Sequence, residues 1–168
     1  MTVRTSKPAI NLREKLSELE FDRVPFQKMP AGSVLQVVNT YTLSYITTSS
    51  TTFIGTGLSL NITPSSTSSQ ILVSVNLNGI NVSGGNGHFA LYVNGSLLQY
   101  LSSSVSYYAT TNETNSVSYQ YLHSPNSTVQ QTYEIYFKNS TGAIVRLNDY
   151  TDGTVREHSS ITLMEIAA

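Results

Sequence analysis

Apolar and polar residues alternate along most of this chain, and the alternation begins close to Ser33. A period of two is the pattern of a β-strand that has one face in a core and the other in solvent. Residues 58–63 and 70–77 show it most clearly, and no helical period of three or four residues appears after Met29. The pattern therefore predicts that this part of the chain folds as an all-β domain.

Clusters of turn-forming residues divide the alternating part into about eight or nine short strands, spaced by roughly 8–12 residues. The expected strands are residues 34–38, 58–63, 70–77, 89–93, 97–101, 117–122, 133–137, 143–147 and 160–166. This spacing is typical of an antiparallel, jelly-roll-like β-sandwich. The last strand is expected to lie inside a sheet, because a loosely held terminal strand would fray.

Two hairpins are predicted within the sandwich. Asn94-Gly95 is the stronger signal, because both central residues of a type I′ turn need a positive φ. The other is expected at residues 139–142, where a turn would return residues 143–147 alongside residues 133–137.

The first 29 residues differ in charge from the rest of the chain. Six of the nine basic residues precede Met29, whereas only Glu113 and Glu134 are charged among residues 30–137. Pro30 and Gly32 follow Met29 closely and punctuate the chain there. We therefore expect an N-terminal anchor with a short helix and linker at residues 1–29, followed by a β-sandwich head at residues 30–168.

A short amphipathic helix is predicted within the anchor. Asn11 and Glu14 have the spacing of a capping box, and Leu12, Leu16 and Leu19 recur on one face. About ten residues are too few for an isolated helix to be stable in water, so the leucine face needs a partner. The partner could be the head of the same chain, but we favour a seam between identical chains or a peg into a larger assembly. Leu12, Leu16 and Leu19 are thus the predicted anchor and oligomer contacts.

The composition argues against several classes of function. Charged residues make up 11% of the chain and the net charge is -1, so no general attraction to nucleic acid or anionic membrane is expected. The chain has no cysteine, which excludes thiolate metal sites and cysteine nucleophiles. No apolar run approaches the ~20 residues that cross a bilayer. We therefore expect neither nucleic-acid binding nor membrane insertion.

No catalytic or metal-binding constellation is apparent in the sequence. His88, His123 and His158 are not spaced as metal ligands, and no G-x-S-x-G turn marks a nucleophile. Residues 55–57 and 84–87 are rich in glycine, but strands follow them rather than helices, so β-turns are expected there and not phosphate cradles. We expect no catalytic residue, metal or cofactor, and predict that the protein is not an enzyme.

Tyrosines are the predicted contact groups, because their side chains combine apolar area with a polar tip that suits sugar or protein surfaces. Half or more of them are expected in the core or between subunits. Tyr107 and Tyr108, in the weakly patterned residues 102–115, are the predicted surface-recognition residues. The tyrosines considered are Tyr92, Tyr100, Tyr107, Tyr108, Tyr119, Tyr121, Tyr133, Tyr136 and Tyr150.

Several segments are similar to virion proteins. RTSKPAINLREKLSEL, at residues 4–19, resembles the N-terminus of tail-fibre and other virion proteins from tailed phages of marine bacteria, including cyanophages. A β-domain common in the same proteins is similar to PAGSVLQVV (30–38), GLSLNITPSS (57–66), SQILV (69–73), LHSPN (122–126) and SITLMEI (160–166).

The resemblance implies a non-enzymatic virion component that is assembled in the cytoplasm of a bacterial host. It also implies a trimeric head, and residues 1–29 would then bind other tail or capsid proteins. Long tail fibres have a shaft between anchor and head, whereas only a short linker separates Leu19 from Ser33 here. A short tail fibre or spike that attaches to a host glycan or protein is therefore the favoured function.

Two alternatives remain open. One is a capsid decoration or cement protein, or head fibre, at a symmetry axis. The other is a glycan-binding lectin or a glycan-active enzyme, which would use carboxylates such as Glu113, Glu134, Asp149 and Asp152.

Overall fold

Ten antiparallel strands make up the part of the chain that the computed structural model describes, which is residues 29–106, 114–149 and 157–168. The predicted N-terminal helix falls outside these residues. The strands are β1 (Val34–Thr42), β2 (Ile46–Thr48), β3 (Ile54–Ile62), β4 (Gln70–Val82), β5 (Asn86–Val93), β6 (Ser96–Ser106), β7 (Asn115–His123), β8 (Gln131–Asn139), β9 (Val145–Leu147) and β10 (Ser159–Ile166).

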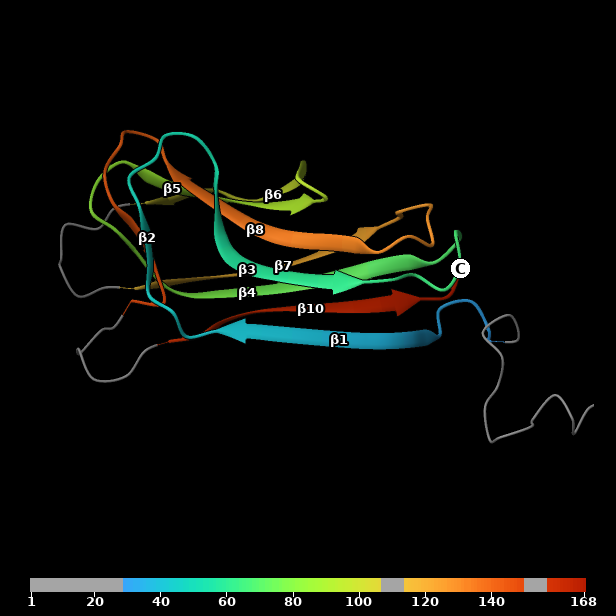
Figure 1. Ribbon diagram of the computed structural model, residues 1–168. Coiled ribbons are helices and arrows are strands. Elements are labelled where there is room, and N and C mark those ends of the chain that lie inside the picture. The colour runs from blue at the N-terminus through green and yellow to red at the C-terminus, as the bar shows by residue number, and fades with distance from the viewer. Residues whose placement is uncertain (1–28, 107–113, 150–156) are drawn as a thin grey trace, which may run out of the picture.

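Eight of these strands form two sheets that pack face to face (Figure 1). The first sheet has the order β1-β10-β4-β7, and the second has the order β3-β8-β5-β6. Most connections pass from one sheet to the other, so the neighbours within a sheet come from distant parts of the sequence. This is the strand order of a jelly roll. The predicted all-β, jelly-roll-like sandwich is confirmed.

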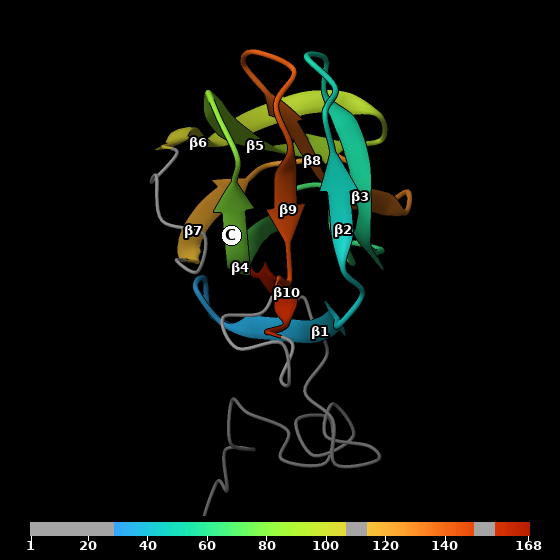
Figure 2. The same ribbon diagram turned by 90° about the vertical axis from the view of Figure 1, so that its left-hand side faces the viewer.

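β2 and β9 close one end of the sandwich (Figure 2). The last residues of β4 pair with β9, which in turn pairs with β2. The predicted hairpin between residues 133–137 and 143–147 is therefore wrong. β8 has β3 on one edge and β5 on the other, so it offers no free edge to the strand that follows it.

A tight corner around Gly79 sets where β4 changes its partners. Gly79 has a φ of +60°, and its carbonyl accepts a hydrogen bond of 3.0 Å from the backbone N–H of Asp149. Asn148, the residue before Asp149, is fully buried with a φ of +56°. Its side-chain amide donates to the carbonyl of Thr42 (3.1 Å), and its oxygen accepts from the Ser159 hydroxyl (2.7 Å). The corner thus joins β1, β4, β9 and β10.

The two glycine-rich segments have different roles in the fold. Residues 83–85 carry the chain from β4 in the first sheet to β5 in the second, and Asn86 and Gly87 are the first residues of β5. The β-turn predicted at residues 55–57 is wrong, because these residues lie inside β3. The pairing of β3 with β8 shifts register between Gly55 and Ser59, and Gly57 has a φ of +80°. The glycines thus permit an irregularity in the strand rather than a reversal of the chain.

The core lies between the inner faces of the two sheets. Every second residue of β4 from Ile71 to Leu77, and of β8 from Tyr133 to Phe137, is at most 1% exposed. Phe137 also stacks on Phe89 of β5, with the ring centroids 6.1 Å apart. The period of two in the sequence therefore reports the inner and outer faces of these strands correctly.

Two further predictions are confirmed. Asn94 and Gly95 have φ values of +49° and +77°, and Val93 pairs with Ser96 across the hairpin. The final strand, β10, lies between β1 and β4, as expected for a chain end held inside a sheet.

Candidate recognition surface

Four aromatic side chains gather on the outer face of the second sheet. We call Phe53, Tyr92, Tyr100 and Tyr136 the tyrosine platform. Tyr92 and Tyr136 stack with their ring centroids 4.0 Å apart and an interplanar angle of 23°. The Phe53 ring lies 6.1 Å from that of Tyr92 and 5.9 Å from that of Tyr100. The four rings thus form one continuous aromatic surface.

The strand register explains why these rings meet. On the middle strand β5, Ala90 points outward and is the partner of Tyr136 on β8 and of Tyr100 on β6. Ala90 is nevertheless 0% exposed. A small residue between two neighbouring tyrosines leaves space that their rings can cover. Phe53 comes from the loop before β3 and extends the surface beyond the strands.

Charged groups lie at the border of the platform. The Lys138 ammonium is 4.8 Å from the centroid of the Phe53 ring, within the range of a cation–π contact. Glu134 is the strand partner of Tyr92. Burial, together with the neighbouring Tyr100 and Tyr136, raises the pKa of Tyr92 above its ordinary value. The Tyr92 hydroxyl therefore stays protonated at neutral pH and can donate a hydrogen bond.

The platform has the properties of a binding surface rather than of a reaction centre. Tyr100 is 54% exposed, and the other three rings are half-buried and held by their neighbours. Rings fixed in this way lose little conformational entropy when a ligand lies on them, and tyrosine hydroxyls add directional hydrogen bonds. Such a surface suits a flat ligand with an apolar face and hydroxyl groups at its edge, such as a sugar ring.

Other tyrosines lie elsewhere in the molecule. Tyr107 and Tyr108, the predicted surface-recognition residues, fall outside the described residues, as do Leu12, Leu16 and Leu19. Tyr133 is in the core, and its hydroxyl lies 2.7 Å from Nδ1 of His123. Burial raises the pKa of Tyr133 and lowers that of His123, so both groups are neutral at pH 7. Tyr119 and Tyr121 of β7 pack against the core from one edge.

Sequence reasoning did not single out the platform. The alternation along β8 does indicate that Tyr136 points outward, because Ile135 and Phe137 point into the core. That β6, β5 and β8 are neighbours follows from the sheet order, which the sequence does not reveal. Phe53 belongs to no alternating segment, so no signal identified it.

Apart from the tyrosine platform, a group of polar side chains surrounds the buried carboxylate of Glu165. The side chain points inward from β10 and is 0% exposed. One carboxylate oxygen accepts from the Ser65 backbone N–H (2.7 Å) and hydroxyl (2.6 Å), and the other accepts from the Gln36 amide (2.6 Å). Burial alone would raise the pKa of this carboxyl, but the hydrogen bonds from the surrounding serine and glutamine groups hold it below its ordinary value.

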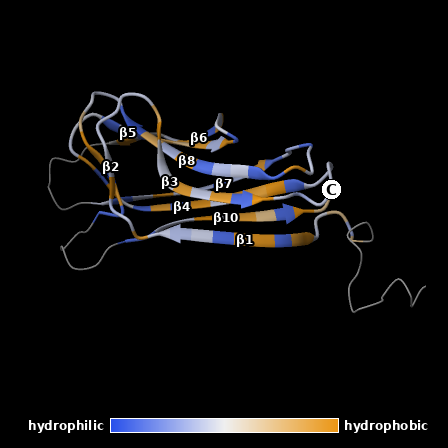
Figure 3. Cartoon of the chain, in the orientation of Figure 1, coloured by the Kyte–Doolittle hydropathy of each residue, from blue (hydrophilic) through white to orange (hydrophobic). Residues whose placement is uncertain are grey.

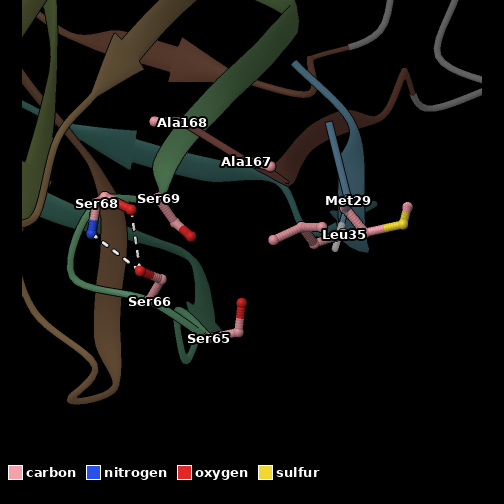
Figure 4. A pocket seen from close by; sticks show the side chains of 8 residues that line it. All are labelled: Met29, Leu35, Ser65, Ser66, Ser68, Ser69, Ala167 and Ala168. Atoms are coloured by element: carbon pink, nitrogen blue, oxygen red, sulfur yellow. Dashed lines mark hydrogen bonds between the residues drawn. The ribbon is translucent and has the colours of Figure 1, made fainter. Parts of the chain in front are cut away.

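A small cavity of about 190 Å³ lies close to Glu165, between the start of β1 and the turn that follows β3 (Figure 4). The Ser66 and Ser68 hydroxyls bond to each other on one side, and Leu35 lies on the other. The lining residues are Met29, Leu35, Ser65, Ser66, Ser68, Ser69, Ala167 and Ala168. The hydrogen bonds from Ser65 and Gln36 to the carboxylate hold the turn after β3 on the first sheet. This centre therefore supports the fold.

The described residues contain no group of three or more His, Cys, Asp or Glu side chains that could hold a metal ion. Among these same residues, no helix is long and apolar enough to cross a membrane.

No family model matches the chain, and no curated protein matches it. Among solved structures, it is similar to the VP2 subviral particle of infectious bursal disease virus, with 13% identity and a TM-score of 0.42 over 81% of this chain and 38% of that chain. The Gt strain structure of the same virus gives 12% identity and a TM-score of 0.39, over 83% of this chain and 37% of that chain. The chain therefore spans less than half of these proteins, and similarity this low carries no argument about function.

Proposed function

We propose that this chain is a non-enzymatic structural protein of a bacteriophage particle, acting as a short tail fibre or spike. Residues 1–29 dock on the particle, and the jelly-roll head projects outward as part of a homotrimer. The single observation that carries the attachment role is the tyrosine platform, an exposed aromatic surface that the core does not need. A polysaccharide of the host cell surface is the ligand that its chemistry suits best.

The surface of the head supports a role outside the cell. Hydroxyl and amide side chains hydrate it, and only nine residues among residues 30–168 are charged, seven of them after residue 137. Because salt screens charges and not uncharged polar groups, contacts made by such a surface change little with ionic strength. That property suits a particle that must bind cells in waters of varying salinity.

Replacing Tyr100 by alanine should weaken binding to bacterial surface polysaccharide by about tenfold. The change removes the most exposed ring of the platform and with it a stacking contact of about 1 kcal/mol or slightly more. Binding of the full chain to an immobilised panel of bacterial surface polysaccharides measures the effect. Tyr45→Ala is the matched control, because Tyr45 is 39% exposed and lies outside the platform. Unchanged binding by both Tyr100→Ala and Tyr136→Ala, or equal loss in the control, would contradict the attachment role.

Replacing Leu12, Leu16 and Leu19 together by serine in the full chain should abolish its incorporation into particles. The head should remain folded, since the core of the described residues is built from side chains of the head's own strands. Quantifying the protein in purified particles tests this expectation, and circular dichroism of the isolated variant checks its fold. Normal incorporation of the triple variant would show that the leucine face is not the docking element.

The short linker between anchor and head also favours a second candidate, a capsid decoration protein. It differs from a fibre in its number of copies. A copy number that matches the symmetry axes of the capsid would favour decoration, whereas a few copies at one vertex would favour a tail fibre or spike.

A further inference from the structure

The outer face of the first sheet is formed by residues that pair in rows across β1, β10, β4 and β7. The rows are Val37-Met164-Leu72-Leu122, Asn39-Thr162-Ser74-Gln120 and Tyr41-Ser160-Asn76-Ser118. This face is turned away from the core, and no other part of the described chain forms a layer over it (Figure 1).

The first of these rows is wholly apolar, and we call Val37, Met164, Leu72 and Leu122 the apolar row. Val37 is 54% exposed and Leu122 is 48% exposed, although both lie on regular strands. Val34, 49% exposed, pairs with Ile166 immediately beside the row. Figure 3 shows the hydrophobic residues of β1 gathered in its first half. Single exposed apolar side chains are ordinary, but a contiguous group across four strands marks an interaction surface.

The lack of charge on this face indicates which partner binds it. None of the residues in the three rows is Asp, Glu, Lys, Arg or His. Uncharged faces of three copies can meet around the axis of the proposed homotrimer without the like-charge repulsion that charged surfaces would produce. The uncharged polar rows contain both donors and acceptors, so they can form hydrogen bonds with their own copies. A shallow groove along Ser74, Asn76, Ser118 and Gln120 also leaves room for a protruding side chain.

The size of the face and the position of Met29, where the described residues begin, are compatible with another copy of the chain as the partner. Four strands about 4.8 Å apart and about seven residues long cover roughly 400 Å² in projection. A stable interface needs about 800 Å² on each partner, so the face supplies about half of the area that one partner needs. The first 28 residues join the described chain at Met29, close in sequence to Val34 and at the end of the sheet where the apolar row lies.

We propose that the outer face of the first sheet is the interface through which copies of this chain form the homotrimer of the proposed function, with the apolar row at one end of the interface. The tyrosine platform lies on the opposite face of the sandwich, so association leaves it on the outside of the assembly. The formation of this interface does not depend on which ligand the tyrosine platform binds.

Replacing Val37 or Leu122 by glutamate tests the interface in the full chain. Each side chain is half exposed, so the head should keep its fold, while charges placed in the apolar row should raise the dissociation constant of the assembly at least tenfold. Sedimentation velocity over a range of micromolar concentrations measures association, and circular dichroism checks the fold. Leu97→Glu and Val129→Glu are matched controls, at 44% and 70% exposure outside this face, and should associate like the unchanged chain.

Three results would overturn the proposal. The first is a full chain that stays monomeric throughout the concentration range. The second is equal association of Val37→Glu, Leu122→Glu and the controls. The third is a full chain that is monomeric but forms oligomers when Leu12, Leu16 and Leu19 are replaced by serine. That result would mean that the N-terminal segment of the same chain, and not a second copy, covers the face. Loss of association in both row variants, with unchanged binding of polysaccharide per chain, would separate the interface from the attachment role.

Discussion

Replacing Gly79 by alanine is expected to destabilise the head by about 3–5 kcal/mol. A Cβ at this position would lie 2.6 Å from the backbone nitrogen and 2.7 Å from the backbone oxygen of Asp149. Both atoms belong to the main chain, so no side-chain rotation relieves the contact. The left-handed φ of +60° contributes about 1 kcal/mol, and the displacement of two packed chain segments adds about 2–4 kcal/mol. Urea unfolding followed by circular dichroism at a fixed protein concentration measures the change.

Gly57→Ala is the control for this experiment. Gly57 has a φ of +80°, close to that of Gly79, but a Cβ there would have no atom within 4 Å. The control should therefore lose only the conformational contribution of about 1 kcal/mol. If Gly79→Ala were no less stable than Gly57→Ala, the corner between β4 and β9 would be able to relax, and its proposed importance for the fold would be wrong.

Replacing Glu165 by glutamine should destabilise the head by about 2–4 kcal/mol at pH 7. The carboxylate accepts from three donors, two on Ser65 and one on Gln36. A glutamine side chain has one oxygen, so its amide group must face at least one of these donors in a site that water does not reach. Free energies of unfolding from urea titrations of both proteins give the difference.

The same substitution should remove a pH dependence of stability. The pKa of Glu165 in the folded head lies below its ordinary value of 4.5. The carboxylate therefore contributes stability that is fully present above pH 4.5 and is lost as the pH falls through the folded pKa. The difference between the unchanged chain and Glu165→Gln should thus shrink on acidification below about pH 4.5. Glu134→Gln, on the outer face of β8, should change stability by less than about 0.5 kcal/mol, and a difference for Glu165→Gln that did not vary with pH would contradict the assignment.

Features that depend on near neighbours in the chain were predictable. The alternation in β8 puts Tyr133, Ile135 and Phe137 on one face, since side chains of a strand point to its two faces in turn, and in the structure that face lies in the core. In β10 the same rule puts Glu165 on one face with Leu163, and in the structure that face is the inner one. Its partners Ser65 and Gln36 lie 100 and 129 residues away in the sequence, so no local pattern could identify them.

The sequence by itself determined that this chain forms strands, which side chains enter the core in clearly alternating strands such as β4 and β8, and where the Asn94-Gly95 hairpin turns. These properties follow from backbone geometry over two to four residues. Only the tertiary structure decided that β9 joins β4 rather than β8, that three outward tyrosines and Phe53 gather on one surface, and that the apolar row crosses four strands. Each of these depends on which strand edges are free and which strands become neighbours, and that choice is made by the packing of the whole sandwich.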